Sequence, residues 1–181
     1  MRTRRREREG PHGSEGQPSL LRLYRACLHN AEDLCHEASL LFRAQRFPRA
    51  FALAFTALEE IAKAHAVADF YTGVLSESEL QDAFRKHRMK TAYLDRVVSI
   101  STGSAEATVE YDPRAAESSV NLRMRALYVE YGIDHAPAMP AEAIGRDLAK
   151  STMDRAEVEL HEMWVQEEYY GHQIGTKGLW K

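Results

Sequence analysis

A run of nine residues, apolar apart from one threonine, is followed directly by two acids and, three residues later, by a lysine. Residues 50–58 read AFALAFTAL, and Glu59, Glu60 and Lys63 continue the same helical pattern, which spans residues 48–72. A helix that is apolar on every side is a buried helix. Charge in such a place is costly and is retained when it is paired or serves a site. The segment therefore predicts a central helix that carries a polar site.

Three other segments also have a helical pattern. Residues 19–45 carry an apolar stripe at spacings of three and four. Residues 76–99 begin with Ser76-x-x-Glu79, a capping box in which a hydroxyl and a carboxylate bind free amides at the helix start. Residues 140–170 carry a rougher apolar stripe. Together with the central segment, these patterns predict four long helices.

The part of the chain before the last helix has no long helical pattern. Residues 100–118 and 132–140 predict loops, with a short helix starting near Arg114. Residues 122–131 contain LYVEY, which predicts an extended connector packed on the bundle. The order of these segments predicts an all-α fold, a bundle of four to five helices with a loop-rich insert before the last long helix.

The 181 residues are enough for one domain, which we expect over residues 19–170. Residues 1–18 are charged and almost free of apolar side chains, which predicts a disordered basic tail. Residues 171–181 lack periodicity and predict a flexible tail. The formal net charge of −3 gives no strong field toward nucleic acid, so contact with RNA requires a local basic patch.

The cysteines and the apolar runs indicate the compartment. Cys27 and Cys35 are eight residues apart in one predicted helix, about 12 Å, which is too far for a disulfide. A reducing cytoplasm is the simplest interpretation. The N-terminus has no apolar stretch typical of a secretory signal, and the run over residues 50–58 ends too early to span a bilayer. We therefore expect a cytoplasmic protein that does not enter a membrane.

Four groups of residues follow one another in order along residues 26–160. The first two helices contain N-A-x-x-L, R-F-x-x-A and A-x-E-E-x-x-K elements, formed by Asn30, Ala31, Leu34, Ala38, Leu41, Phe47, Ala50, Ala57, Glu59, Glu60 and Lys63. The later groups are an H-x-x-K pair, an L-Y-V-x-Y element and a P-x-E helix, formed by His87, Lys90, residues 127–131, Pro140, Glu142, Ala149 and Ala156. Together they resemble the pattern of AbiV abortive infection proteins. Before the lysine, where the family often has glycine, this chain has Ala62, which fits a close helix crossing.

The resemblance to AbiV implies a HEPN-like fold, a homodimer and a role in abortive infection, in which an infected bacterium halts its own growth, often by stopping translation. Many HEPN proteins are metal-independent ribonucleases with an Arg-x(4–6)-His motif. Arg155 and His161 fit that spacing. However, chance alone gives about two such matches in a chain of this composition, and residues six apart lie on different helix faces. These two residues are therefore the weaker catalytic candidates.

The stronger catalytic candidates are Glu59, Glu60, Lys63, His87 and Lys90, which converge if the second and third helices are antiparallel neighbours. A histidine can take the proton of a 2′-hydroxyl, and a lysine can stabilise charge on the phosphate. A carboxylate can orient the histidine, and the need for a 2′-hydroxyl restricts the substrate to RNA. We expect no cofactor. We also expect no metal, because the adjacent glutamates point about 100° apart and the helix lacks the Glu-x-x-His pattern of di-iron bundles.

Arg85, Arg88, Tyr128 and Tyr131 are the candidate binding residues. The arginines belong to a dense basic cluster in the third predicted helix. The tyrosines could stack on bases, but packing over the bundle is the role we expect of them by default.

Two functions fit these observations. In the first, the chain is an effector enzyme that a phage-encoded activator protein switches on to degrade RNA. In the second, it is a non-catalytic helical dimer that senses or binds a phage or host protein, and the Glu60–Lys63 pair is a polar contact that locks the bundle. A weaker third interpretation is a nucleotide-binding partner of a nucleotidyltransferase.

Overall fold

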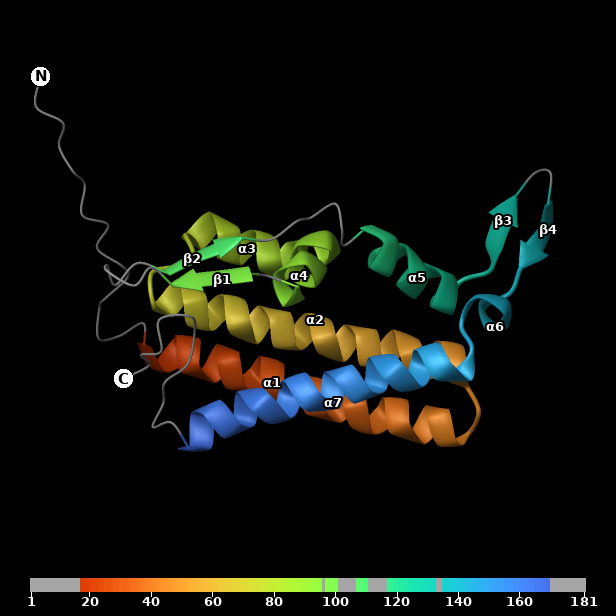
Figure 1. Cartoon of the computed structure of the whole chain (residues 1–181), viewed down its shortest axis with the longest axis horizontal. Coiled ribbons are helices and arrows are strands. Elements are labelled where there is room, and N and C mark those ends of the chain that lie inside the picture. Colours follow the sequence, from red (N-terminus) through yellow and green to blue (C-terminus); the bar gives the residue numbers. More distant parts are fainter. Residues whose placement is uncertain (1–16, 96, 101–106, 111–116, 133–134, 170–181) are drawn as a thin grey trace, which may run out of the picture.

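A computed structural model describes residues 17–95, 97–100, 107–110, 117–132 and 135–169. Most of the two predicted tails lies outside these residues, although Gln17 and Pro18 already belong to the first helix. Three long helices, α1 (Gln17–Arg43), α2 (Phe47–Tyr71) and α7 (Arg146–Tyr169), lie side by side and form the body of the molecule (Figure 1). The predicted all-α bundle is confirmed, with a loop-rich insert before the last long helix.

The central position of α2 follows from its composition. Sixteen of its 25 residues are buried, and α2 contacts each of the other helices that the structure describes. Many of the buried residues are alanines, including Ala54, Ala57 and Ala64, whose small side chains let neighbouring helices approach closely. The helix starts at a tight turn in which Gln45 has a φ of 58°, and Pro48 occupies its first turn, where a missing amide hydrogen costs nothing.

The predicted helix over residues 76–99 divides into two. They are α3 (Glu77–Arg85) and α4 (His87–Leu94), and Lys86 between them has an extended backbone with φ −109° and ψ 113°. The predicted capping box is present, because the Ser76 amide donates to Glu79 Oε2 at 2.7 Å and the Glu79 amide donates to Ser76 Oγ at 3.4 Å. The basic run around Lys86 has no apolar side chain to bury. The break turns α4 so that its own apolar residues, such as Tyr93, pack against α2.

The insert contains more regular structure than the sequence predicted. Strands β1 (Val97–Ile100) and β2 (Ala107–Glu110) form an antiparallel ribbon, and β3 (Glu130–Gly132) and β4 (His135–Ala138) form a second one. Between them lies α5 (Glu117–Leu127), so the predicted extended connector is wrong over residues 122–127. The cause is tertiary: α5 packs on α2 and buries Ala126, which favours the helix over the local strand propensity.

The last predicted helix is also interrupted. A single turn, α6 (Pro140–Ala143), is followed by Ile144 and Gly145, and α7 then runs to Tyr169. Ile144 is almost fully buried beside Phe51 and Phe55 of α2, which anchors this bend in the core. The two divided helices and α5 explain why the described residues hold seven helices and not four to five.

Candidate functional site

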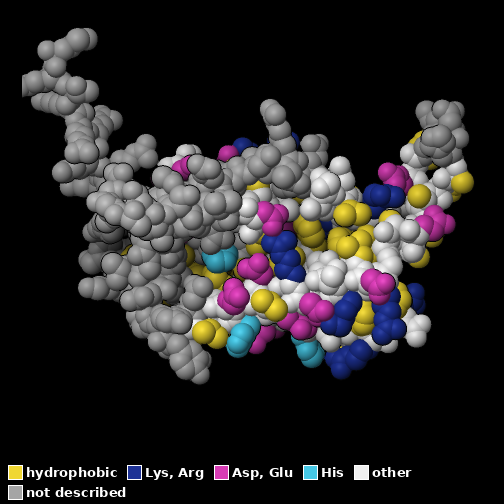
Figure 2. Space-filling model, in the orientation of Figure 1, with side chains coloured by type: hydrophobic (Ala, Val, Ile, Leu, Met, Phe, Trp, Pro, Cys, Tyr) yellow, Lys and Arg dark blue, Asp and Glu magenta, His cyan; other side chains and the backbone are white. Residues whose placement is uncertain are grey.

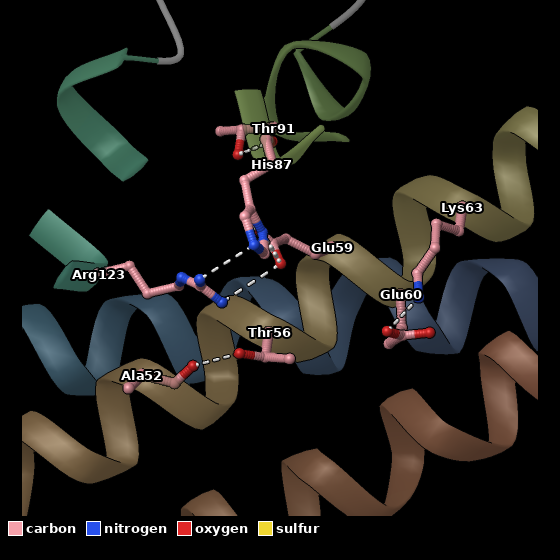
Figure 3. A network of polar contacts seen from close by, with 8 residues as sticks. All are labelled: Ala52, Thr56, Glu59, Glu60, Lys63, His87, Thr91 and Arg123. Carbon is pink, nitrogen blue, oxygen red and sulfur yellow. Dashed lines mark hydrogen bonds and ion pairs between the residues drawn. The ribbon is translucent and has the colours of Figure 1, made fainter. Parts of the chain in front are cut away.

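A buried carboxylate on α2 is the centre of the site. Glu59 has 2% of its side chain exposed and points toward α4 and α5 (Figure 3). Nδ1 of His87, the first residue of α4, lies 2.9 Å and 3.0 Å from its two oxygens. Because a carboxylate only accepts hydrogen bonds, Nδ1 carries the hydrogen and donates it. The contact therefore fixes the imidazole tautomer and leaves a lone pair on Nε2.

Arg123 of α5 completes this cluster, and the sequence analysis did not predict it. Its Nη1 lies 3.5 Å from Glu59 Oε2 and its Nη2 lies 3.4 Å from His87 Nε2. The side chain is 14% exposed, and its Nε is buried with no hydrogen-bond partner among the residues that the structure describes. The spacing of Leu122 and Ala126, four residues apart, is compatible with a helix around Arg123. The β-prone residues 127–131 that follow favoured an extended segment instead.

Lys90 is a second cation close to this cluster. It is only 8% exposed, and it forms no ion pair with any of the described residues. Burial lowers the pKa of its ammonium below the ordinary 10.5, and this effect outweighs the attraction of Glu59 and Glu60, which acts in the opposite direction. Repulsion from Lys63 and Arg123 lowers the pKa further. Lys90 therefore lies within electrostatic reach of both carboxylates and both neighbouring cations.

Glu60 and Lys63 form a separate ion pair with each other, with side chains 12% and 15% exposed. Figure 3 shows this pair apart from His87 and Arg123, and Lys63 Nζ also lies 5.4 Å from the centre of the Phe84 ring. The five predicted residues therefore share no single contact: Glu59 binds His87, Glu60 binds Lys63, and Lys90 lies within electrostatic reach of both pairs. The reason is helical geometry, because consecutive residues such as Glu59 and Glu60 project about 100° apart.

Arg155 and His161 lie on α7 and do not join the cluster around Glu59. Arg155 Nη2 lies 2.8 Å from Asp95 Oδ1, just after α4, and its Nε lies 3.7 Å from Glu159. Arg155 also borders a cavity of about 320 Å³ between α2, α5 and α7, whose walls include Phe55. His161 is exposed. The two members of the Arg-x5-His motif therefore have different surroundings.

The four predicted binding residues all lie on the surface. Arg85 and Arg88 are exposed on either side of the α3–α4 break, close in sequence to His87. Tyr128 and Tyr131 are exposed as well, so the default prediction that they pack over the bundle is wrong. The end of α5 leads away from the bundle toward the β3–β4 ribbon, which leaves these rings without a helix to cover (Figure 1).

The described residues contain no group of three or more histidine, cysteine or acidic side chains arranged to hold a metal ion. Both cysteines are free thiols, as their spacing predicted. Burial raises the pKa of Cys27 and of Cys35 from 9.0 to about 11, with smaller contributions from nearby carboxylates. Within the same residues, every helix is too short or too polar to cross a lipid bilayer.

An all-helical bundle with a charged cluster buried on its central helix is what the HEPN-like class predicts, and the family comparison assigns the chain to that class. The family model HEPN_AbiV, described as AbiV, matches residues 19–161, and the chain belongs to the AbiV family. Membership indicates a role in abortive infection, a defence of bacteria against phages. Comparison with curated proteins and comparison with solved structures each gave no match.

Proposed function

We propose that this protein is a cytoplasmic, homodimeric effector of abortive infection that cleaves RNA without a metal and so arrests growth or translation in the infected cell. The observation that supports the proposal is the contact of His87 with a buried carboxylate on one ring nitrogen and a guanidinium on the other. A carboxylate that orients a histidine is a recurring feature of general acid–base sites.

The proposed reaction uses the 2′-hydroxyl of RNA as the nucleophile. His87 Nε2 takes the hydroxyl proton while the 2′-oxygen attacks the adjacent phosphorus. The bond from phosphorus to the 5′-oxygen breaks, that oxygen takes a proton from solvent water, and a 2′,3′-cyclic phosphate remains. Glu59 stabilises the imidazolium that forms, and Arg123 and Lys90 supply positive charge to the phosphorane oxygens.

In this proposal, the arrangement of Arg123 against His87 is the resting state of the effector. Arg123 lies 3.4 Å from Nε2, the nitrogen that must accept the proton. In the proposed mechanism Arg123 leaves Nε2 and turns to the substrate phosphate. A phage-encoded activator protein that shifts α5 would expose the base in this way, so the enzyme would be silent in uninfected cells.

The test is cleavage of total RNA by purified protein, with and without phage lysate. We expect His87→Ala and Arg123→Ala to abolish cleavage while remaining folded by circular dichroism. The matched control for the histidine is His36→Ala, which alters an exposed histidine on α1. The matched control for the arginine is Arg125→Ala, two residues after Arg123, which removes an exposed ion pair with Glu130. Cleavage that persists in both site variants, or RNA that stays intact under every condition, overturns the proposal.

A second candidate function is a non-catalytic dimer that binds a phage or host protein. Its support is a group of exposed apolar side chains on α5 and around the β3–β4 ribbon, formed by Met124, Tyr128, Val129, Tyr131 and Met139. Figure 2 shows hydrophobic side chains gathered over this part of the molecule. Such patches mark interaction surfaces. Growth arrest that survives His87→Ala but is lost in Val129→Ser favours this function over catalysis.

A further inference from the structure

Exposed arginines gather at the end of the bundle where α1 ends and α2 and α7 begin. They are Arg43 of α1, Arg46 in the turn, Arg49 of α2 and Arg146 of α7. Figure 1 shows the three helix ends meeting there, and Figure 2 shows Lys and Arg side chains gathered at the same end. We call these four residues the arginine patch.

Aromatic contacts hold the arginine patch together. The guanidinium carbon of Arg146 lies 5.8 Å from the centre of the Phe42 ring, and the Phe42 and Phe47 ring centres are 5.2 Å apart. Phe47 directly follows Arg46 in the chain. The start of α7 is thus tied to the α1–α2 turn, and arginines from separate elements share one surface.

The positive charge of the arginine patch is not neutralised. None of its four residues forms an ion pair with any other residue that the structure describes, and Arg43 only donates a hydrogen bond to the Ser39 carbonyl at 3.3 Å. Several exposed cations elsewhere are paired, as Lys86 is with Asp82 and Lys150 with Asp154, whereas among the described residues Arg85 and Arg88 beside the α3–α4 break also have no ion pair. The chain as a whole has a net charge of −3, so four arginines without ion pairs on one surface form a local excess of positive charge. Such an excess favours a negatively charged partner.

The backbone adds to this positive field. The first turn of α2 contains no acidic residue, and no side chain caps its amides. The N-terminus of α7 lies at the same end, and Asp147 is the acidic residue in its first turn. The amino ends of helices carry partial positive charge and attract anions. Two helix N-termini and four guanidinium groups therefore all raise the positive potential at this end of the bundle, and the Asp147 carboxylate lowers it.

We infer that the arginine patch binds the phosphate backbone of single-stranded RNA and anchors the substrate away from the cleavage cluster. This inference rests on the proposed function, which supplies RNA as the polyanion. Arginine suits the role because its planar fork binds phosphate oxygens in a bidentate manner. Backbone contacts of this kind position a strand without reading its sequence.

The experiment measures binding of a fluorescent single-stranded RNA by anisotropy at several salt concentrations, in the His87→Ala background so that the RNA survives. The triple variant Arg43→Gln, Arg46→Gln, Arg49→Gln should bind about tenfold more weakly or worse. The slope of log K against log salt should fall by about 2, because each lost phosphate contact removes about 0.7 for a single strand. Arg125→Gln, which removes a paired arginine, is the control for a single Arg46→Gln change.

Three outcomes separate this inference from the proposed function and from other partners. If the triple variant loses RNA binding but, with His87 restored, still cleaves a dinucleotide, the anchor is supported. Binding and salt slope that match those of the unaltered patch overturn it, whether or not His87 proves catalytic. If the triple change abolishes binding to phosphatidylglycerol vesicles and leaves RNA binding intact, an anionic membrane is the partner and the inference is wrong.

Discussion

Nδ1 of His87 lies between the two carboxylate oxygens of Glu59, at 2.9 Å and 3.0 Å, although the two residues are 28 positions apart in the chain. The carboxylate is buried, whereas 46% of the histidine side chain remains exposed. The imidazole is therefore held from the protein side and remains accessible from the solvent side. This arrangement holds a tautomer in place and leaves the ring within reach of a ligand.

Glu59 should be among the most sensitive positions in the chain. Glu59→Ala leaves Arg123 and Lys90 without their buried counter-charge, and we expect it to lower the free energy of unfolding by about 3–5 kcal/mol. Glu59→Gln keeps the shape and should cost less. Urea unfolding gives both values. As the control, Glu37→Ala on the exposed surface of α1 should change stability by no more than about 0.5 kcal/mol, and an equal effect at Glu59 would contradict this account.

Replacing Lys90 or Lys63 by methionine should change the stability of the protein in opposite directions. Lys90 is buried without an ion pair among the described residues, so Lys90→Met should stabilise the protein at neutral pH by about 1 kcal/mol or more. Lys63→Met breaks the pair with Glu60 and should destabilise it by about 1–3 kcal/mol. A loss of stability in both variants would show that Lys90 is as well compensated as Lys63.

The effect of Lys90 should also depend on pH. Its pKa in the folded chain is below the ordinary 10.5, so between those values the unfolded chain keeps a proton that the folded chain has released. Stability from this group therefore rises with pH through that window, and the full penalty applies below it. The advantage of Lys90→Met over the unaltered chain should shrink as the pH approaches 10.5. A difference that stays constant up to that pH contradicts the assignment.

The two thiols should react slowly in the folded protein. A pKa raised from 9.0 to about 11 lowers the thiolate fraction at pH 8 about a hundredfold. Ellman's reagent should therefore modify Cys27 and Cys35 far more slowly than it does in urea, and more slowly than it does glutathione. Fast modification of Cys27 in the native state would show that α1 opens locally or that the thiol is not buried.

Ala62 should tolerate removal of its methyl group better than enlargement. It is fully buried among Ala66, Leu75 and Tyr93, where α2 meets α3 and α4. Ala62→Leu should cost about 1–3 kcal/mol through overpacking, whereas Ala62→Gly should cost about 1 kcal/mol through helix propensity. Thermal unfolding ranks the two variants. If leucine is accepted without loss, the contact between these helices is looser than the structure indicates.

The sequence determined the helical core and the need for a polar site within it. A segment that is apolar on every side must be buried, and the charges that follow it must find partners, so a buried α2 that carries paired charges could be predicted from local pattern. His87 and Lys90 became candidates through their three-residue spacing and the resemblance to AbiV. The capping box at Ser76 could also be predicted from the sequence, because it depends on two residues that are three positions apart. Patterns of this kind act within one or two helical turns.

Only the tertiary structure decided which charges meet. Glu59 faces His87 and Arg123 because α4 and α5 cross α2 at that turn, whereas Glu60, one residue on, is rotated to another side and pairs with Lys63. The local pattern around Arg123 allowed a helix, but only the packing of α5 on α2 brings this guanidinium to Glu59. Partner choice among buried charges depends on how helices distant in sequence are placed, and no local pattern encodes that placement.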